Sequence, residues 1–456
     1  MNPAMMALAM VALGCAAPSS APSLAAAPHL KAPEFPESGV IPKKLPAPTT
    51  SVTVAGGGRY LVFHLAKQRK LAIFDVTQAK ITKYLPMGGD DLLIAGGMHH
   101  LVVVSRDHRV IQRWDLKTFQ KGLTLALDEP GQIDQLAMGY ASAGPVMLNT
   151  RKGLRFYDPQ TLKRVSYSEP DNLWGSHPQY PAIIRASADG MAFTAWVPRI
   201  SPNGIRLLTL EGNKYSMRSQ HASAGYLIPS ADGSLVLTSS GVYSQELVKL
   251  NKNRFDGLRC LPALHPAYIL GVKGVGPYYG QTPKTHPTLS IFTANDRQLL
   301  TTIPDLEELS GTFGRSVPLD QRVFFLPTAN LLITLPTTND EIVLRKLSIV
   351  DILQKSSIDY LFVESVPARA IATGETFTYD IATRSARGKV RISLDSGPEG
   401  MKLKRNRLTW KVPADIEPGP TSVILTLTDA SGQEVFHSFT LKVSNDDARP
   451  KAPEQK

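Results

Sequence analysis

A repeat of about 40 residues, beginning near residue 51, constrains the fold of this chain more than any other feature. Residues 55–62 (AGGGRYLV) are echoed 40 positions later by residues 95–102 (AGGMHHLV). The tetrapeptide SADG recurs at residues 187–190 and 230–233, a spacing of 43. The last units are fainter and lie around residues 268–292 and 331–347. A period of this length is typical of stacked or closed repeat architectures.

Each unit is long enough for four short strands separated by turn residues, which make one small antiparallel sheet. Such a sheet cannot bury both faces alone, so copies must stack, and radial closure leaves only short, protected edges. The roughly 305 residues from 51 to 355 divide into seven units of about 43 or 44. The sequence therefore predicts an all-β chain with a β-propeller over residues 51–355. We expect about seven four-stranded blades, with six or eight as alternatives.

An aromatic-Asp pair ends a strand-like run in three successive units. The pairs are Phe74-Asp75, Trp114-Asp115 and Tyr157-Asp158. A Thr follows the second and third Asp by three positions, at Thr118 and Thr161. Asp side chains bond readily to the backbone of the next residues, so we expect each Asp to hold the turn after its strand. We expect each aromatic ring to pack between neighbouring blades.

The 40-residue repeat ends before residue 362, and a different pattern of predicted strands follows. Five runs alternate or are rich in β-branched residues: 376–381, 389–394, 407–412, 422–428 and 435–443. Gly, Pro and Ser residues lie between these runs and predict turns there. About 80 residues with some six strands suit a small β-sandwich, which we expect over residues 362–445. The polar tail, residues 446–456, is predicted to be disordered.

The N-terminus indicates export. An apolar run of about ten residues, 4–13, has the length of a signal-peptide core and is too short to span a bilayer. We expect residues 1–27 to be a signal peptide or a lipoprotein signal. Cys15 closes an Ala-Leu-Gly-Cys sequence similar to a bacterial lipoprotein box and is the candidate for lipidation. Residues 28–50 are rich in Pro and Ala and are predicted to be a semi-extended linker.

These motifs resemble those of known families. The repeat region resembles the WD40-like (YVTN-type) β-propellers of bacterial exported proteins, and Trp114-Asp115 is its one literal Trp-Asp pair. Residues 396–401, 408–413 and 425–432 are similar to Ig-like and cadherin-like modules of bacterial surface proteins. That resemblance implies a spacer or adhesive module. The Asp-rich calcium ligands of cadherins are absent, so no calcium is expected.

Charge suggests a second class of partner. The formal net charge is +11, and the basic residues are scattered except for one cluster. That cluster comprises Lys402, Lys404, Arg405, Arg407 and Lys411. It is a solvated hairpin or a contact for an acidic envelope polymer. Without a long basic run, nucleic acid is not expected as a partner. Contact with a membrane is expected only through a lipid anchor.

Catalytic motifs are missing from the sequence. Ser142 lacks the first Gly of a Gly-x-Ser-x-Gly elbow, and neither a phosphate-binding loop nor a His-Glu-x-x-His motif occurs. Cys260 is expected to be a core residue rather than a nucleophile. No cofactor and no metal site are predicted. The sequence favours a non-enzymatic, periplasmic, envelope-bound or secreted scaffold that binds a protein or peptide. The alternative is an envelope enzyme or carbohydrate-binding protein with its site at the central channel.

Overall fold

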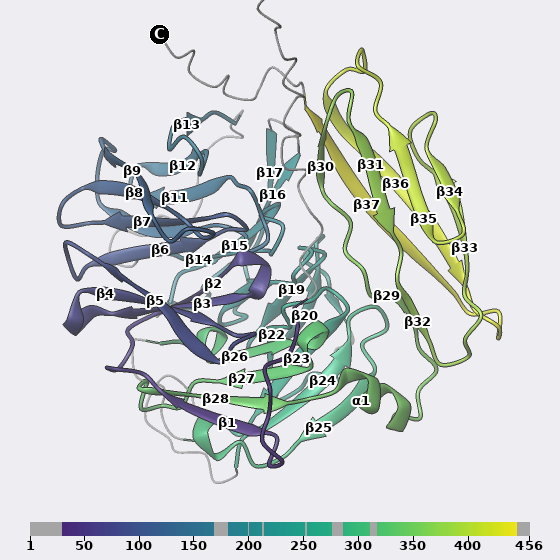
Figure 1. Cartoon of the computed structure of the whole chain (residues 1–456), viewed down its shortest axis with the longest axis horizontal. Helices are drawn as coiled ribbons and strands as arrows, with labels where there is room; N and C mark the ends of the chain where they lie inside the picture. Colours follow the sequence, from purple (N-terminus) through teal and green to yellow (C-terminus); the bar gives the residue numbers. More distant parts are fainter. Residues whose placement is uncertain are drawn as a thin grey trace, which may run out of the picture.

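The computed structural model describes residues 30–167, 181–198, 200–211, 214–250, 253–275, 286–310 and 317–444. The regular structure of these residues is mainly β, with short 3-10 turns and one α-helix, α1 (Ile349–Lys355). Seven four-stranded antiparallel sheets lie between Val40 and Lys346, and the remaining strands form a separate C-terminal module (Figure 1). No helix in the described ranges is long and apolar enough to cross a membrane.

The first six blades take their strands in chain order. Blade 1 comprises β2 (Val52–Ala55), β3 (Tyr60–Leu65), β4 (Lys70–Asp75) and β5 (Lys80–Pro86). Blade 2 comprises β6 (Leu92–Gly96), β7 (His100–Ser105), β8 (Val110–Asp115) and β9 (Lys121–Ala126). Blade 3 comprises β10 (Ile133–Ala137), β11 (Val146–Thr150), β12 (Gly153–Tyr157) and β13 (Arg164–Val165). Blade 4 comprises β14 (Ile183–Ala186), β15 (Ala192–Trp196), β16 (Ile205–Glu211) and β17 (Lys214–Gln220). Blade 5 comprises β18 (Leu227–Pro229), β19 (Leu235–Thr238), β20 (Gly241–Ser244) and β21 (Lys249–Leu250). Blade 6 comprises β22 (Arg259–Pro262), β23 (Tyr268–Lys273), β24 (Thr288–Thr293) and β25 (Leu299–Ile303).

Blade 7 combines the two ends of the repeat region. Its inner three strands are β26 (Val323–Leu326), β27 (Leu331–Thr334) and β28 (Glu341–Lys346). Its outer strand is β1 (Val40–Lys44), which pairs antiparallel with β28. The prediction that all of residues 28–50 form a linker is therefore wrong for β1. Pairing with a strand 300 residues away is invisible to local composition, and an outer strand tolerates Pro42 because one of its edges needs no ladder bonds.

The blades form a closed ring. The first strands of consecutive blades contact one another from β2 through β22. The backbone N–H of Leu264 donates to Phe325 O at 2.8 Å and joins blade 6 to blade 7. The N–H of Val52 donates to the Gln321 side chain at 3.2 Å and joins blade 7 to blade 1. Closure leaves no first strand with an unpartnered neighbour, as expected for a propeller.

Each aromatic of the repeated pairs packs between two blades. Phe74 of blade 1 lies in a core cluster with Phe324 and Ile333 of blade 7. Trp114 of blade 2 packs with blade 1, and Tyr157 of blade 3 packs with blade 2. Burying a large ring at each junction removes apolar surface from both neighbouring sheets, so it ties the blades together.

The Asp of each pair holds the following turn. Asp115 Oδ1 accepts the backbone N–H of Lys117 at 3.0 Å and of Thr118 at 2.7 Å, together with the Thr118 hydroxyl at 2.9 Å. Asp158 makes the same set of bonds with Gln160 and Thr161. Four positions after the Asp, the chain turns through a left-handed residue. These residues are Ala79, Phe119 and Leu162, with φ of 47°, 57° and 55°.

Glycines of the repeated turns let neighbouring blades approach closely. A Cβ atom on Gly96 would lie 2.3 Å from the carbonyl oxygen of Val54, so only glycine fits there. The close approach allows the N–H of Gly56 to donate to Gly97 O at 2.8 Å. The Ala-Gly-Gly repeat is thus a requirement of blade-to-blade backbone packing.

The C-terminal module has two larger sheets and one strand pair around one core. One sheet contains β30 (Ala370–Ala372), β37 (Glu434–Ser444), β36 (Gly419–Thr428) and β33 (Arg391–Ser396). The other contains β31 (Thr376–Asp380), β35 (Arg407–Lys411) and β34 (Lys402–Lys404), and β29 (Leu361–Val363) pairs with β32 (Thr383–Ser385). Phe377 and Trp410 from one sheet and Leu425 and Phe439 from the other lie in the same buried cluster.

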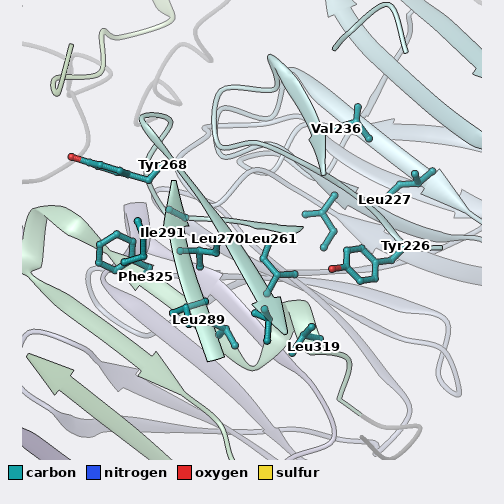
Figure 2. Close-up of a cluster of buried hydrophobic side chains, with 14 of the residues drawn as sticks. Tyr226, Leu227, Val236, Leu261, Tyr268, Leu270, Leu289, Ile291, Leu319 and Phe325 are labelled. Atoms are coloured by element: carbon teal, nitrogen blue, oxygen red, sulfur yellow. The ribbon is translucent and has the colours of Figure 1, made fainter. Parts of the chain in front are cut away.

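One large core joins the propeller to the C-terminal module. It runs from blade 4 through blade 7 and includes Leu353 of α1 and Phe362 of β29. Figure 2 shows Leu270 and Ile291 of blade 6 in this core, beside Phe325 of blade 7. Ser348 caps α1 by accepting the N–H of Asp351 at 3.2 Å. The module is therefore packed onto the propeller rather than tethered to it.

Candidate functional site: the central channel and its two ends

The first strands of all seven blades enclose a cavity of about 160 Å³ along the ring axis. Its walls are mainly apolar. One lining residue from each blade, in chain order, is Val54, Ile94, Ala137, Ile184, Ile228, Ala263 and Phe324. The strands place these side chains here because apolar residues recur along each inner strand.

One ion pair crosses the channel. Nε of Arg185, on β14 of blade 4, donates to Oδ2 of Asp320, which precedes β26 of blade 7. Blades 4 and 7 are nearly opposite in a ring of seven, so the pair spans the channel. Arg185 also donates to Ile184 O at 3.0 Å, and its guanidinium lies 5.6 Å from the centre of the Trp196 ring. The Asp320 side chain is only 8% exposed, and pairing compensates the charge of this carboxylate.

The described part of the channel offers little for bond-making chemistry. Among the residues that the structure describes, no group of three or more His, Cys, Asp or Glu side chains is placed to hold a metal ion. Cys260 is fully buried outside the channel lining, and burial raises the pKa of its thiol to about 12. A thiol with that pKa is not a nucleophile at neutral pH. The apolar walls and the Arg185–Asp320 pair join the first strands of the blades across the channel.

The two ends of the ring differ. Because the strands within a blade are antiparallel, their turns alternate between the ends. One end of the ring, which we call the module end because the C-terminal module contacts it, carries the first turn of each blade, such as β14–β15 and β22–β23. The opposite end carries the second turn, such as β3–β4 and β7–β8.

The chain covers part of the module end with its own residues. A Cβ placed on Gly58, in the β2–β3 turn, would lie in van der Waals contact with Leu30 Cδ1, Leu264 Cδ1 and Leu326 Cδ2 at 3.7, 3.9 and 3.7 Å. Leu30 is 8% exposed and belongs to the same core cluster as Leu326. A residue from before β1 therefore lies where blades 1, 6 and 7 meet.

The C-terminal module contacts the same end. His265, in the β22–β23 turn, lies with Nε2 2.6 Å from the carbonyl oxygen of Glu364. The Glu364 carboxylate accepts a hydrogen bond from Arg384 Nε at 2.7 Å. The Tyr268 ring packs edge-on against Phe362, with 5.6 Å between ring centres. Two apolar rings and a buried hydrogen bond thus fix residues 362–364 to blade 6.

A polar contact extends this junction to blade 4. Nε of Arg369 lies 4.0 Å from Oδ2 of Asp189 in the β14–β15 turn. Burial raises the pKa of Asp189, and the nearby Arg369 guanidinium opposes that rise. In the module, the Tyr379 hydroxyl lies 3.2 Å from His437 Nε2. Burial, together with the nearby charge of Arg369, lowers the pKa of His437 to about 4.

The opposite end carries charged and polar turns. Arg106 and Asp91 form an ion pair there, and Ser105 Oγ lies 3.0 Å from His108 Nδ1. Lys67 and Asp107 are exposed at the β3–β4 and β7–β8 turns. Among the described residues, neither Leu30 nor the C-terminal module reaches these turns in any hydrogen bond or ion pair. This end presents side chains of both signs around an apolar channel.

The residues singled out in the sequence are dispersed around the ring. Phe74, Trp114 and Tyr157 are buried at three blade junctions, and Asp75 is 1% exposed and pairs with Arg59 at 2.8 Å. The structure does not bring them together in one site. Cys15 and the tail 446–456 lie outside the described residues. The sequence patterns do not single out Arg185 and Asp320, because neither residue belongs to a repeated motif and the two lie 135 positions apart.

Seven antiparallel sheets closed around one channel define the chain as a β-propeller protein. No protein-family model and no curated protein matches the sequence. Solved structures align with about two-thirds of it. The β-propeller domain of Cps50 (Swd1) of "Myceliophteria thermophila" has 11% identity and a TM-score of 0.45, covering 68% of this chain and 100% of that chain. U3-55K has 10% identity and a TM-score of 0.46, covering 68% and 99%. Hydrazine synthase of Kuenenia stuttgartiensis has 12% identity and a TM-score of 0.42, covering 68% and 99%. These similarities are too remote to indicate a ligand or a reaction, and the propeller assignment rests on the sheets themselves.

Proposed function

We propose that this chain is a non-enzymatic binding or scaffold protein that recognises a protein or peptide at the opposite end of its propeller. The observation that carries the proposal is the asymmetry of the two ends. Leu30 and residues 362–364 are packed against the module end. At the opposite end, residues 45–49 contact the turns of blades 1 and 7, where Gln68 donates to Pro46 O at 3.1 Å and the N–H of Thr49 donates to Asn339 O at 2.8 Å. Among the described residues, the C-terminal module makes no hydrogen bond or ion pair with the turns of this end, and Lys67 and Asp107 are exposed there.

The chemistry of the channel supports binding over catalysis. Its described walls are mainly apolar, and the two charged side chains that line it, Arg185 and Asp320, pair with each other. A catalytic site needs a nucleophile, base or metal with access to substrate. The described lining supplies no free carboxylate and imidazole together. For that reason we propose binding rather than catalysis as the role of the channel region.

We further propose that residues 362–445 are an Ig-like or cadherin-like module and that the chain is exported. Two sheets around one core, with Trp410 fully buried, support the first proposal. The apolar N-terminal run and the Ala-Leu-Gly-Cys sequence support the second. In this protein the module stiffens the propeller and fixes its orientation, since residues 362–364 share the propeller core.

Photo-crosslinking tests the location of the binding surface. A benzoyl-phenylalanine is placed at Lys67 or Asp107 on the opposite end, and at Lys117 on the module end as the matched position. Lys83, on the outer strand β5, serves as the rim control. The full chain is irradiated in envelope extract of its source cells.

The proposal expects a discrete protein adduct from the Lys67 and Asp107 positions and none from Lys117 or Lys83. Adducts of equal yield at all four positions would refute a specific surface. Turnover of a glycan or ester panel by the purified chain would refute the non-enzymatic proposal and favour an enzyme.

A further inference from the structure

The outer face of the β31–β35–β34 sheet carries cations and hydroxyls in rows across the strands. The register places Lys402 beside Thr409 and Lys404 beside Arg407 on one side of the sheet. Cross-strand partners on β31 continue these rows with Thr378 beside Thr409. Paired residues point to the same face, and rows two residues apart repeat at about 6.6 Å along a strand. Lys402, Lys404, Arg407 and Thr378 are all exposed.

The charges on this face are unbalanced. Its one carboxylate, Asp380, accepts two hydrogen bonds from Arg407, so this pair is neutral as a unit. The Lys411 ammonium donates to the carbonyl oxygen of Gly374. Among the described residues, no ion pair engages Lys402, Lys404 or Arg405. Three cations therefore face solvent beside one neutral pair and a row of hydroxyls.

The turn joining β34 to β35 places a further exposed cation at the end of this face. Arg405 is the first residue of its two-residue turn, exposed, with φ of 58°. Glycine occupies this left-handed region without cost, whereas a side chain there raises the conformational energy. Arg405 is thus a third cation, at the tip of the hairpin next to Lys404. Its left-handed backbone conformation lowers the stability of the folded chain.

We propose that this face binds a linear anionic polysaccharide through its sulfate or carboxylate groups. Ammonium and guanidinium groups recognise these anions, and the Thr378 and Thr409 hydroxyls can bond to sugar hydroxyls. The face carries no aromatic ring on which a nucleic-acid base would stack. It also carries no apolar side chain that would enter a bilayer. This site lies on the module, away from the propeller channel, and does not depend on the proposed function.

Binding of the full chain to fluorescent heparin and to fluorescent alginate tests the proposal. Lys402→Ala with Lys404→Ala should weaken binding about tenfold at physiological salt and reduce the slope against log salt by about two. Lys80→Ala with Lys83→Ala is the matched control, because it removes the same charge from the exposed strand β5. The control pair should change binding less than twofold.

Arg405→Gly separates binding from folding. It should weaken polysaccharide binding while leaving the denaturant midpoint unchanged or higher, because glycine suits the left-handed turn. Equal losses from both lysine pairs would overturn the proposal, as would undetectable binding to either polysaccharide. Tighter binding to duplex DNA, or to vesicles rich in anionic lipid, than to heparin and alginate would also overturn it.

Discussion

Nε2 of His265 and the carbonyl oxygen of Glu364 lie 2.6 Å apart and connect blade 6 to the C-terminal module. Nδ1 of the same ring accepts the N–H of Ala267 at 3.2 Å, so the neutral ring carries its proton on Nε2 and donates it to Glu364. Burial lowers the pKa of His265 and keeps the ring neutral. Both ring nitrogens are thus used, and the contact depends on one tautomer.

His265→Ala should destabilise the chain by about 1–3 kcal/mol, because it leaves the buried carbonyl of Glu364 without its donor. Denaturant unfolding of the full chain measures the change. His221→Ala is the matched control, since His221 is exposed and a surface truncation should cost less than about 0.5 kcal/mol. Equal stability of the two variants would show that the contact does not hold the module to the propeller.

Acid should loosen the C-terminal module through His437. Burial lowers the pKa of His437 from the ordinary 6.5 to about 4. Between these values the unfolded chain binds a proton that the folded chain does not, so the free energy of unfolding falls as pH drops from about 6.5 toward 4. The loss should reach up to about 3 kcal/mol.

His437→Gln isolates that contribution, because glutamine can still donate to the Tyr379 hydroxyl but does not titrate. Urea unfolding at pH 7 and pH 4.5 should give a smaller difference for this variant than for the natural chain. An unchanged difference would assign the acid sensitivity to the carboxylates instead.

The sequence predicts those features that depend on local bonding. The Asp115 and Asp158 turns repeat because each is closed within five residues, and the Gly96 position repeats because every blade meets its neighbour in the same way. The last repeat is faint for a related reason. It supplies only three strands, and β1 completes its blade from the other end of the chain.

The remaining features depend on contacts between distant residues. The composition of residues 28–50 indicates a spacer, because the partner of β1 lies 300 positions away. Arg185 and Asp320 look like ordinary surface charges until ring closure brings β14 and β26 to opposite sides of one channel. The tripeptide 263–265 shows no sign of its contact with residue 364 for the same reason. Periodicity therefore predicts the blades but not what spans or covers them.

Removing one partner of the channel pair should be costly. Arg185→Ala leaves the Asp320 carboxylate, 8% exposed, without its counter-charge, and about 3–5 kcal/mol of stability should be lost. Arg185→Met combined with Asp320→Leu should recover most of that loss, because no charge remains buried. Denaturant unfolding of Arg185→Met, Asp320→Leu and their double variant measures the coupling, and additive losses would contradict a direct interaction.

The repeated turns should tolerate truncation poorly. Asp115→Ala removes three hydrogen bonds that hold the turn between β8 and β9, with an expected loss of about 1–2 kcal/mol, similar to loss of a helix cap. Asp158→Ala should cost about the same, because its bonds are the same. Asp107→Ala, at an exposed turn, should change stability by less than about 0.5 kcal/mol when unfolded in parallel. Near-equal midpoints for all three would contradict the role of the aromatic-Asp repeat.

Hydrogen exchange of the full chain, with and without the crosslinked partner, tests the central claim most directly. The claim is that the opposite end binds a partner, while the module end is occupied by residues 30 and 362–364. We predict slower exchange in the β3–β4 and β7–β8 turns, residues 66–69 and 106–109, and no change at residues 263–267. Protection confined to residues 263–267 and 361–364, with residues 66–69 and 106–109 unchanged, would contradict the account.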